Sequence, residues 1–219
     1  MAQELTLRIP TEWSDISLDR YLKLQTLLKQ YEGDEEATTA ILLMELCGLD
    51  AEYLKGLRIE DFLMLRNELS KFITKTDYEL QRFVKWDGVE YGFEPNLGQM
   101  SYGAYLDISK FNSLAIDDNW VKIMNILYRP VTKKTGDMYE IEPYTLKDRT
   151  HMIKHWNMEI NFGALFFFVH LSMDLVSSIP NFLKEVEGLP HIKQILLKSG
   201  EVTNRLLNLQ EVISPNSPK

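Results

Sequence analysis

Apolar residues recur at helical spacing through most of the first 73 residues. The clearest stretch places apolar side chains at Leu18, Tyr21, Leu22, Leu27 and Leu28. Ser17 precedes it and is a residue type favoured at helix N-caps. Gly33 and Gly48 each follow an apolar run, where glycine commonly ends a helix. This pattern predicts a helical N-terminal part over residues 1–76.

The pattern changes to an alternation of apolar and polar residues between Tyr78 and Phe93. Two alternating runs flank the dipeptide Asp87-Gly88, which favours a type I′ turn because both central residues of that turn need a positive φ. The sequence therefore predicts an antiparallel hairpin around this dipeptide. A second run, residues 131–142, is polar, and both a hairpin and a mobile loop fit it. Both runs belong to a predicted middle part, residues 77–145.

Helical spacing returns after Leu146 and predicts a C-terminal helical part over residues 146–211, followed by a flexible tail at 212–219. Its most apolar stretch, Phe162–Leu171, is shorter than the roughly 20 residues that a bilayer span needs. We therefore expect a helix buried on nearly all sides, ending near Pro180, and no membrane span. The predicted fold class is mainly α with a small antiparallel β-hairpin or sheet insertion (α+β), in one compact domain.

Charge and cysteine content narrow the classes of function. The chain has 32 acidic and 24 basic residues and a net charge of −8, which disfavours direct nucleic-acid binding because phosphate contacts need clustered basic side chains. The only cysteine, Cys47, cannot form a disulfide within the chain and favours a reducing, cytosolic origin. The first ten residues also lack the apolar run of a signal peptide.

Motifs that carry common chemistries are absent from the sequence, including the P-loop, the dinucleotide-binding glycine motif, the nucleophile elbow and the zinc-protease motif. The one candidate metal site consists of His151, His155 and Glu159, whose spacing of four places all three on one face of a helix. The alternative is that these are ordinary solvated or half-buried polar residues. We expect no enzyme activity, no cofactor and no metal.

A partner-binding surface has candidates near the two hairpins. Tyr91 and Phe93 share one face of the first hairpin, because alternate residues of a strand point the same way. Tyr128 and Arg129 lie where a helix enters the polar run, and both residue types are enriched at interface hot spots. The alternatives are that Tyr91 and Phe93 pack the sheet onto the helices, and that Arg129 caps the carbonyls of its own helix.

Four segments together resemble a family of small proteins encoded among the virion genes of tailed bacteriophages, in particular the crAss-like phages of gut Bacteroidota. The first is Ile9–Tyr21, which reads Ile-Pro-Thr-Glu-Trp-Ser-Asp-Ile-Ser-Leu-Asp-Arg-Tyr. The others are Gly88–Leu97, Tyr105–Asp107 and Leu127–Pro130. The similarity covers about residues 5–170, and its motifs are structural rather than chemical.

The resemblance implies a virion-associated or assembly protein that has no catalytic residues. Such a protein is a neck or tail component or a packaged cargo protein, made in the host cytoplasm and located in the virion. Its expected partners are other phage virion proteins, with a homo-oligomer in the particle as a further expectation. The alternatives are a tail-assembly chaperone that is not retained in the virion and a metal-dependent enzyme or regulator built around His151.

Overall fold

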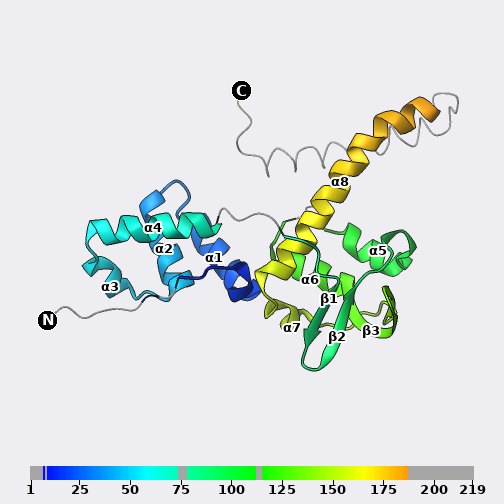
Figure 1. Cartoon of the computed structure of the whole chain (residues 1–219), viewed down its shortest axis with the longest axis horizontal. Coiled ribbons are helices and arrows are strands. Elements are labelled where there is room, and N and C mark those ends of the chain that lie inside the picture. The colour runs from blue at the N-terminus through cyan, green and yellow to red at the C-terminus, as the bar shows by residue number, and fades with distance from the viewer. Residues whose placement is uncertain (1–6, 8, 74–77, 112–114, 187–219) are drawn as a thin grey trace.

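The computed structural model of the chain describes residues 7, 9–73, 78–111 and 115–186, and for residues 175–186 it describes the backbone alone. This part contains eight α-helices and one four-stranded antiparallel sheet, which confirms the predicted α+β class (Figure 1). The predicted tail at 212–219 and the end of the predicted C-terminal part lie outside the described residues.

Four helices form the N-terminal part and lie together at one end of the molecule (Figure 1). They follow a short 3₁₀ turn at Trp13–Asp15 and are α1 (Leu18–Gln30), α2 (Glu35–Cys47), α3 (Ala51–Gly56) and α4 (Ile59–Ile73). The side chains of Ser17, Asp34 and Asp50 cap the first three by accepting hydrogen bonds from backbone N–H groups. Gly48 ends α2 with a φ of 68°, a conformation that glycine adopts without steric cost.

The predicted first hairpin is present as β1 (Phe83–Trp86) and β2 (Val89–Phe93). Asp87 and Gly88 join the strands with φ angles of 47° and 74°, the positive values that a type I′ turn requires. Val84 and Tyr91 are paired across the two strands and are both buried. The face that carries them therefore packs onto the helices.

The polar run at 131–142 also forms a hairpin, which settles the choice between hairpin and loop. Helix α5 (Tyr102–Ser109) and helix α6 (Asp118–Leu127) precede it, and its strands are β3 (Tyr128–Thr135) and β4 (Met138–Ile141). We expected Tyr128 and Arg129 at the point where a helix enters this polar run. Instead β3 begins at Tyr128, and Pro130 pairs with Tyr91 of β2, so the two hairpins form one sheet in the order β1-β2-β3-β4.

The second hairpin bends over the outer face of the first. A Cβ atom at Gly92 would lie 2.8 Å from Cε2 of Tyr139, so the absence of a side chain on β2 lets the Tyr139 ring approach the strand. The Tyr139 hydroxyl donates a hydrogen bond to the Phe93 carbonyl at 2.6 Å, and its ring centroid is 4.6 Å from that of Phe83. One face of the first hairpin is thus covered by helices and the other by β4.

The last two helices of the described residues connect the sheet to the N-terminal part. They are α7 (Thr150–Lys154) and α8 (Met158–Val186). Between them the chain pairs with the start of α1, through N–H of Leu18 to the carbonyl of Trp156 and N–H of Met158 to the carbonyl of Ile16, both at 2.8 Å. These hydrogen bonds hold the N-terminal helices against the body of the molecule.

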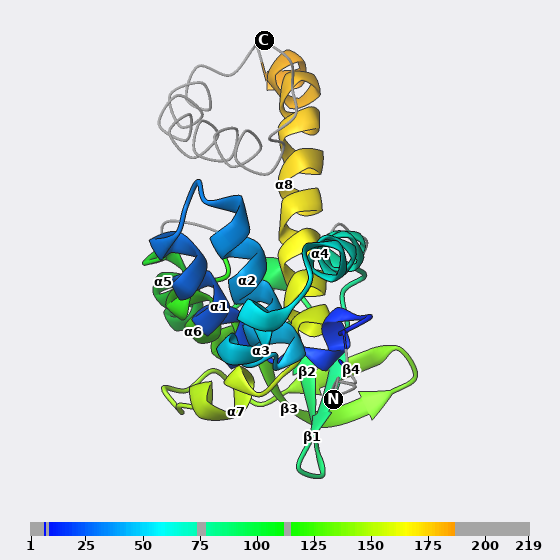
Figure 2. The same cartoon turned by 90° about the vertical axis from the view of Figure 1, so that its left-hand side faces the viewer.

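Helix α8 is buried only over its first part, which corrects the expectation of a helix buried on nearly all sides. Met158, Ile160 and Ala164 are buried, whereas Leu171 and Met173 are exposed. The helix also continues past Pro180 and projects from the body (Figures 1 and 2). No helix in the described ranges has both the length and the apolarity to cross a membrane.

The best-buried part of the core lies between the sheet, α6, α7 and the start of α8. Its fully buried side chains there are Trp120, Val121, Met124, Leu127, Tyr128, Ile153, Trp156 and Met158. Among these large rings, the Trp120 Nε1–H donates to Oδ1 of the buried Asn161 at 3.0 Å. Pairing this donor removes the cost of burying an unsatisfied indole N–H.

Candidate functional site

The four residues that we predicted as a binding surface are all buried. The Tyr91 ring lies 5.8 Å from that of Trp156, and the Phe93 ring lies 5.2 Å from that of Tyr128. Trp156 lies between α7 and α8, and the Phe93 ring is also 5.4 Å from that of Phe167 on α8. Both side chains therefore pack the sheet onto the helices, which is the alternative that the sequence left open. The placement corrects the interface prediction, because a partner cannot reach these side chains in this conformation.

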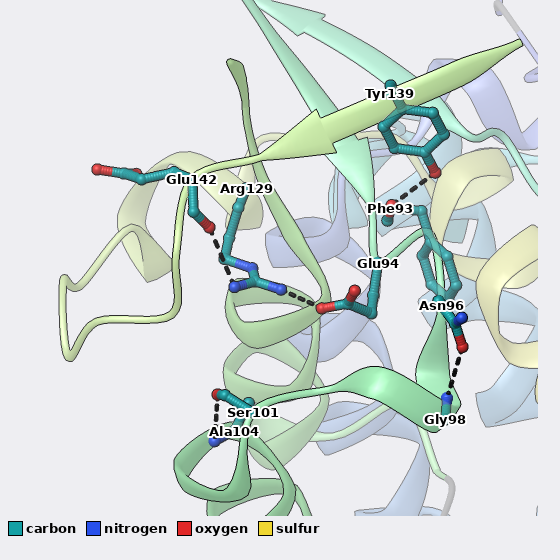
Figure 3. Close-up of polar contacts among 9 residues, drawn as sticks. All are labelled: Phe93, Glu94, Asn96, Gly98, Ser101, Ala104, Arg129, Tyr139 and Glu142. Atoms are coloured by element: carbon teal, nitrogen blue, oxygen red, sulfur yellow. Dashed lines mark hydrogen bonds and ion pairs between the residues drawn. The ribbon is translucent and has the colours of Figure 1, made fainter. Parts of the chain in front are cut away.

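Arg129 is neither exposed nor a cap for its own helix. It lies on β3, its Nη2 forms an ion pair with the Glu94 carboxylate, and its Nη1 donates to the Glu142 carbonyl at 3.0 Å (Figure 3). Both charged side chains are more than nine-tenths buried. Burial lowers the pKa of Arg129, while the neighbouring Glu94 carboxylate opposes that shift. Through these two contacts Arg129 joins β3 to the end of β2 and to the segment that follows β4.

Two further polar contacts extend this network. The Arg149 guanidinium pairs with the Glu142 carboxylate, so Glu142 receives one arginine at its carbonyl and another at its side chain. The Tyr144 hydroxyl donates to the Asp107 carboxylate on α5. Burial, together with this hydrogen bond, raises the pKa of Tyr144 to about 12. The segment 142–144 is therefore attached at three points, to β3, α5 and the chain before α7.

Three residues of this network, Glu94, Arg129 and Tyr144, line a groove of about 1190 Å³ between β4 and the chain that follows β2. Its lining includes Leu80, Arg82, Phe93, Glu94, Leu97, Arg129, Tyr139, Ile141, Tyr144, Phe167 and Leu171. Figure 3 shows Arg129 between Glu94 and Glu142, and the Tyr139 hydroxyl directed at the Phe93 carbonyl. Because Glu94 and Arg129 neutralise each other, the buried charges of the groove act as a clamp that fixes the second hairpin.

The histidine cluster is not on one helix, which corrects the geometry of the candidate metal site. Helix α7 ends at Lys154 and α8 begins at Met158, so His155 lies in the break between them and Glu159 on the second helix. The His155 ring stacks on Trp86 with centroids 6.0 Å apart. Within the described residues there is no group of three or more His, Cys, Asp or Glu side chains placed to hold a metal ion.

Two exposed apolar faces were not predicted from the sequence. On α5, Tyr102, Tyr105 and Leu106 are 75%, 61% and 41% exposed. On the first two turns of α4, the exposed fractions of Ile59, Leu63 and Met64 are 69%, 51% and 60%. Apolar residues exposed singly are ordinary on a protein surface, but clusters of them mark interaction sites. We name these two sets the α5 face and the α4 face.

The α5 face had a signal in the sequence. Residues spaced by three and four share one side of a helix, and Tyr102, Tyr105 and Leu106 have that spacing after the N-cap Ser101. What the spacing did not reveal is which side of the helix faces the core. The structure places Ala104, the smallest apolar side chain of α5, against the body and leaves the aromatic side uncovered.

No protein-family model, no curated protein and no solved structure matches the chain.

Proposed function

We propose that this protein is a non-enzymatic, virion-associated protein of a tailed bacteriophage, a neck or tail component or a packaged cargo protein. It acts through contacts with other virion proteins, without a cofactor and without direct nucleic-acid binding. It is made in the host cytoplasm and becomes part of the particle.

The observation that carries the proposal is the clustering of exposed apolar side chains on two ordered helices. Tyrosine contributes large contact area with few rotatable bonds and is enriched at interface hot spots. Tyr102 and Tyr105 project from α5, whose own position is fixed by the Ser101 cap and by the hydrogen bond of Asp107 with Tyr144. Such an ordered aromatic face supports binding to a protein surface.

The buried charges support the same interpretation. A general acid or base must lie within hydrogen-bond reach of the substrate atom with which it exchanges a proton. In the groove, the buried carboxylate of Glu94 is engaged by Arg129, and the partly exposed carboxylate of Glu142 is paired with Arg149. These pairs favour a structural role for the groove and leave the exposed faces as the sites of interaction.

Mass spectrometry of purified virions of the phage that encodes this chain tests the location. We expect the protein in the particle, in constant ratio to the major virion proteins. Its presence in infected cells together with its absence from purified virions would favour a tail-assembly chaperone and would overturn the virion proposal.

A second measurement tests whether the α5 face is responsible. We expect the double substitution Tyr102→Ser and Tyr105→Ser to lower incorporation into virions by at least tenfold while the protein remains folded. Met138→Ser is the matched control, because Met138 is 76% exposed and lies on β4, away from both faces. Equal incorporation of the double variant and the control would exclude the α5 face.

A further inference from the structure

Helix α5, which carries the aromatic face, depends on its neighbours for stability. It has eight residues, fewer than the roughly 12–15 that an isolated helix needs to be stable in water. Its inward side chains are the fully buried Ala104 and the partly buried Ile108. Tertiary contacts on this side therefore determine what fraction of the time α5 is folded.

The Tyr144 side chain contacts α5 at two points. A Cβ atom at Gly103 would lie 3.6 Å from two carbons of the Tyr144 ring, which is an ordinary packing distance. The Tyr144 hydroxyl donates to the Asp107 carboxylate, which lies four residues further along the same side of the helix. Tyr144 thus joins the first and second turns of α5 to the segment that follows β4.

Glu142, two residues before Tyr144, is held by its backbone and by its side chain. The Glu142 N–H donates to the Pro130 carbonyl at 2.8 Å, and the Glu142 carbonyl accepts from Nη1 of Arg129 at 3.0 Å (Figure 3). The Glu142 carboxylate pairs with Arg149. All three of these partners lie outside α5, so they act on that helix only through the connecting chain.

The connection between Glu142 and Tyr144 is stiff. The residue between them is Pro143, whose ring fixes φ at about −65°. A proline also restricts the residue before it to extended backbone, and that residue is Glu142. A displacement of Glu142 therefore moves Tyr144 with it, because few rotations between the two can absorb the change.

We propose that residues 142–144 form a relay, through which the bonds around Glu142 control how firmly α5 is held. This inference rests on the proposed function, because it names what regulates the α5 face. While Glu142 is held, Tyr144 keeps α5 folded and its aromatic face ordered for binding. When Glu142 is released, Tyr144 shifts and α5 unfolds more often. The apparent affinity of the face then falls with the fraction of copies that present it.

Hydrogen–deuterium exchange on the full chain measures the relay, with the amides of α5 as the reporter and those of α2 as the internal reference. Tyr144→Ala removes both contacts to α5 and should raise exchange of the α5 amides about tenfold or more. Arg149→Met should raise the same rates by about 2-fold to 30-fold, although the bonds of Arg149 go to Glu142 and Asn125. The α2 rates should not change.

Three further variants test whether Arg149 acts by holding Glu142. Glu142→Gln breaks the same ion pair from its other side and should act like Arg149→Met. Arg149→Lys keeps a cation near the Glu142 carboxylate and should return the α5 rates towards the unmodified values. Lys133→Met is the matched control, because it breaks an exposed pair with Glu140 on the second hairpin and should leave the α5 rates unchanged.

A double variant decides whether the effect of Arg149 passes through Tyr144. If it does, Arg149→Met has nothing left to act on once Tyr144→Ala is present. The double variant should then exchange no faster in α5 than Tyr144→Ala alone. Three results would each overturn the relay: effects that multiply in the double variant, unchanged α5 rates in both Arg149→Met and Glu142→Gln, or an equal rise in the α2 rates.

The outcome is separate from that of the virion tests. If the exchange rates show the relay but Tyr102→Ser with Tyr105→Ser does not lower incorporation into virions, the α5 face is not the docking site and the relay stands. If incorporation depends on the α5 face and Arg149→Met leaves α5 exchange unchanged, the relay fails and the virion proposal stands.

Discussion

Helix α6 and the first two turns of α4 are both rich in apolar residues, but those of α6 are buried and those at the start of α4 are exposed. On α6, six of the ten residues are buried, including Trp120, Met124 and Leu127. On α4, the buried residues Leu69 and Phe72 belong to the second half, and Ile59, Leu63 and Met64 face solvent. Burial of the α6 side chains therefore stabilises the fold, whereas the exposed apolar side chains at the start of α4 contribute little to its stability.

The largest effect is expected at the centre of the α6 side. Trp120→Ala removes a fully buried ring and leaves Asn161 without its indole partner, so unfolding in urea should show a loss of about 3–5 kcal/mol. This loss of stability combines the cost of the cavity with the cost of leaving the buried Oδ1 of Asn161 without its donor. A loss as small as that of an exposed residue would mean that α6 is not the core helix described above.

The next prediction tests whether the buried charge of Arg129, on the strand that follows α6, is tolerated only because Glu94 pairs with it. Glu94→Gln removes the negative partner of the buried Arg129 and should lower the free energy of unfolding by about 3 kcal/mol. Glu140→Gln on the second hairpin is the matched control, since the side chains of Glu140 and Lys133 are both 69% exposed and the Lys133 Nζ lies 3.7 Å from the Glu140 carboxylate. Its cost should lie within the range of surface pairs, about 0–1 kcal/mol. Equal costs for the two variants would contradict the clamp.

A smaller effect is expected at Gly92, and it tests whether there is room for a side chain between β2 and β4. Gly92→Ala places a methyl group 2.8 Å from Tyr139 and 2.9 Å from Ile141, so we expect a loss of about 1–3 kcal/mol as the second hairpin shifts. Gly103→Ala on α5 is the control, because its nearest neighbour, Tyr144, would lie at an ordinary 3.6 Å. That substitution should be neutral or stabilising in a helix. Thermal unfolding of both variants gives the comparison.

The smallest effect is expected on the α4 side. Ile59→Ser changes a residue that is 69% exposed, so at low protein concentration its free energy of unfolding should stay within about 0.5 kcal/mol of the unmodified value. A loss comparable to that of Trp120→Ala at low concentration would remove the distinction between the two helices.

The sequence by itself determined the helix starts, the first turn and the fold class. Ser17, Asp34 and Ser101 cap helices, and Asp87-Gly88 forms a type I′ turn, because these features depend on hydrogen bonds and φ angles within a few residues. The alternation of apolar and polar residues up to Phe93 likewise needed no distant partner to be interpreted as a hairpin.

Only the tertiary structure decided how these elements are joined and which faces remain open. Tyr128 continues a helical apolar pattern, but its pairing with Phe93 draws it into a strand, and Arg129 becomes an internal ion-pair partner of a residue 35 positions away. The break at His155 arises where the chain pairs with the start of α1, which no local signal encodes. Exposure of the α5 face follows from Ala104 packing inward, because burial depends on contacts between segments that are distant in the sequence.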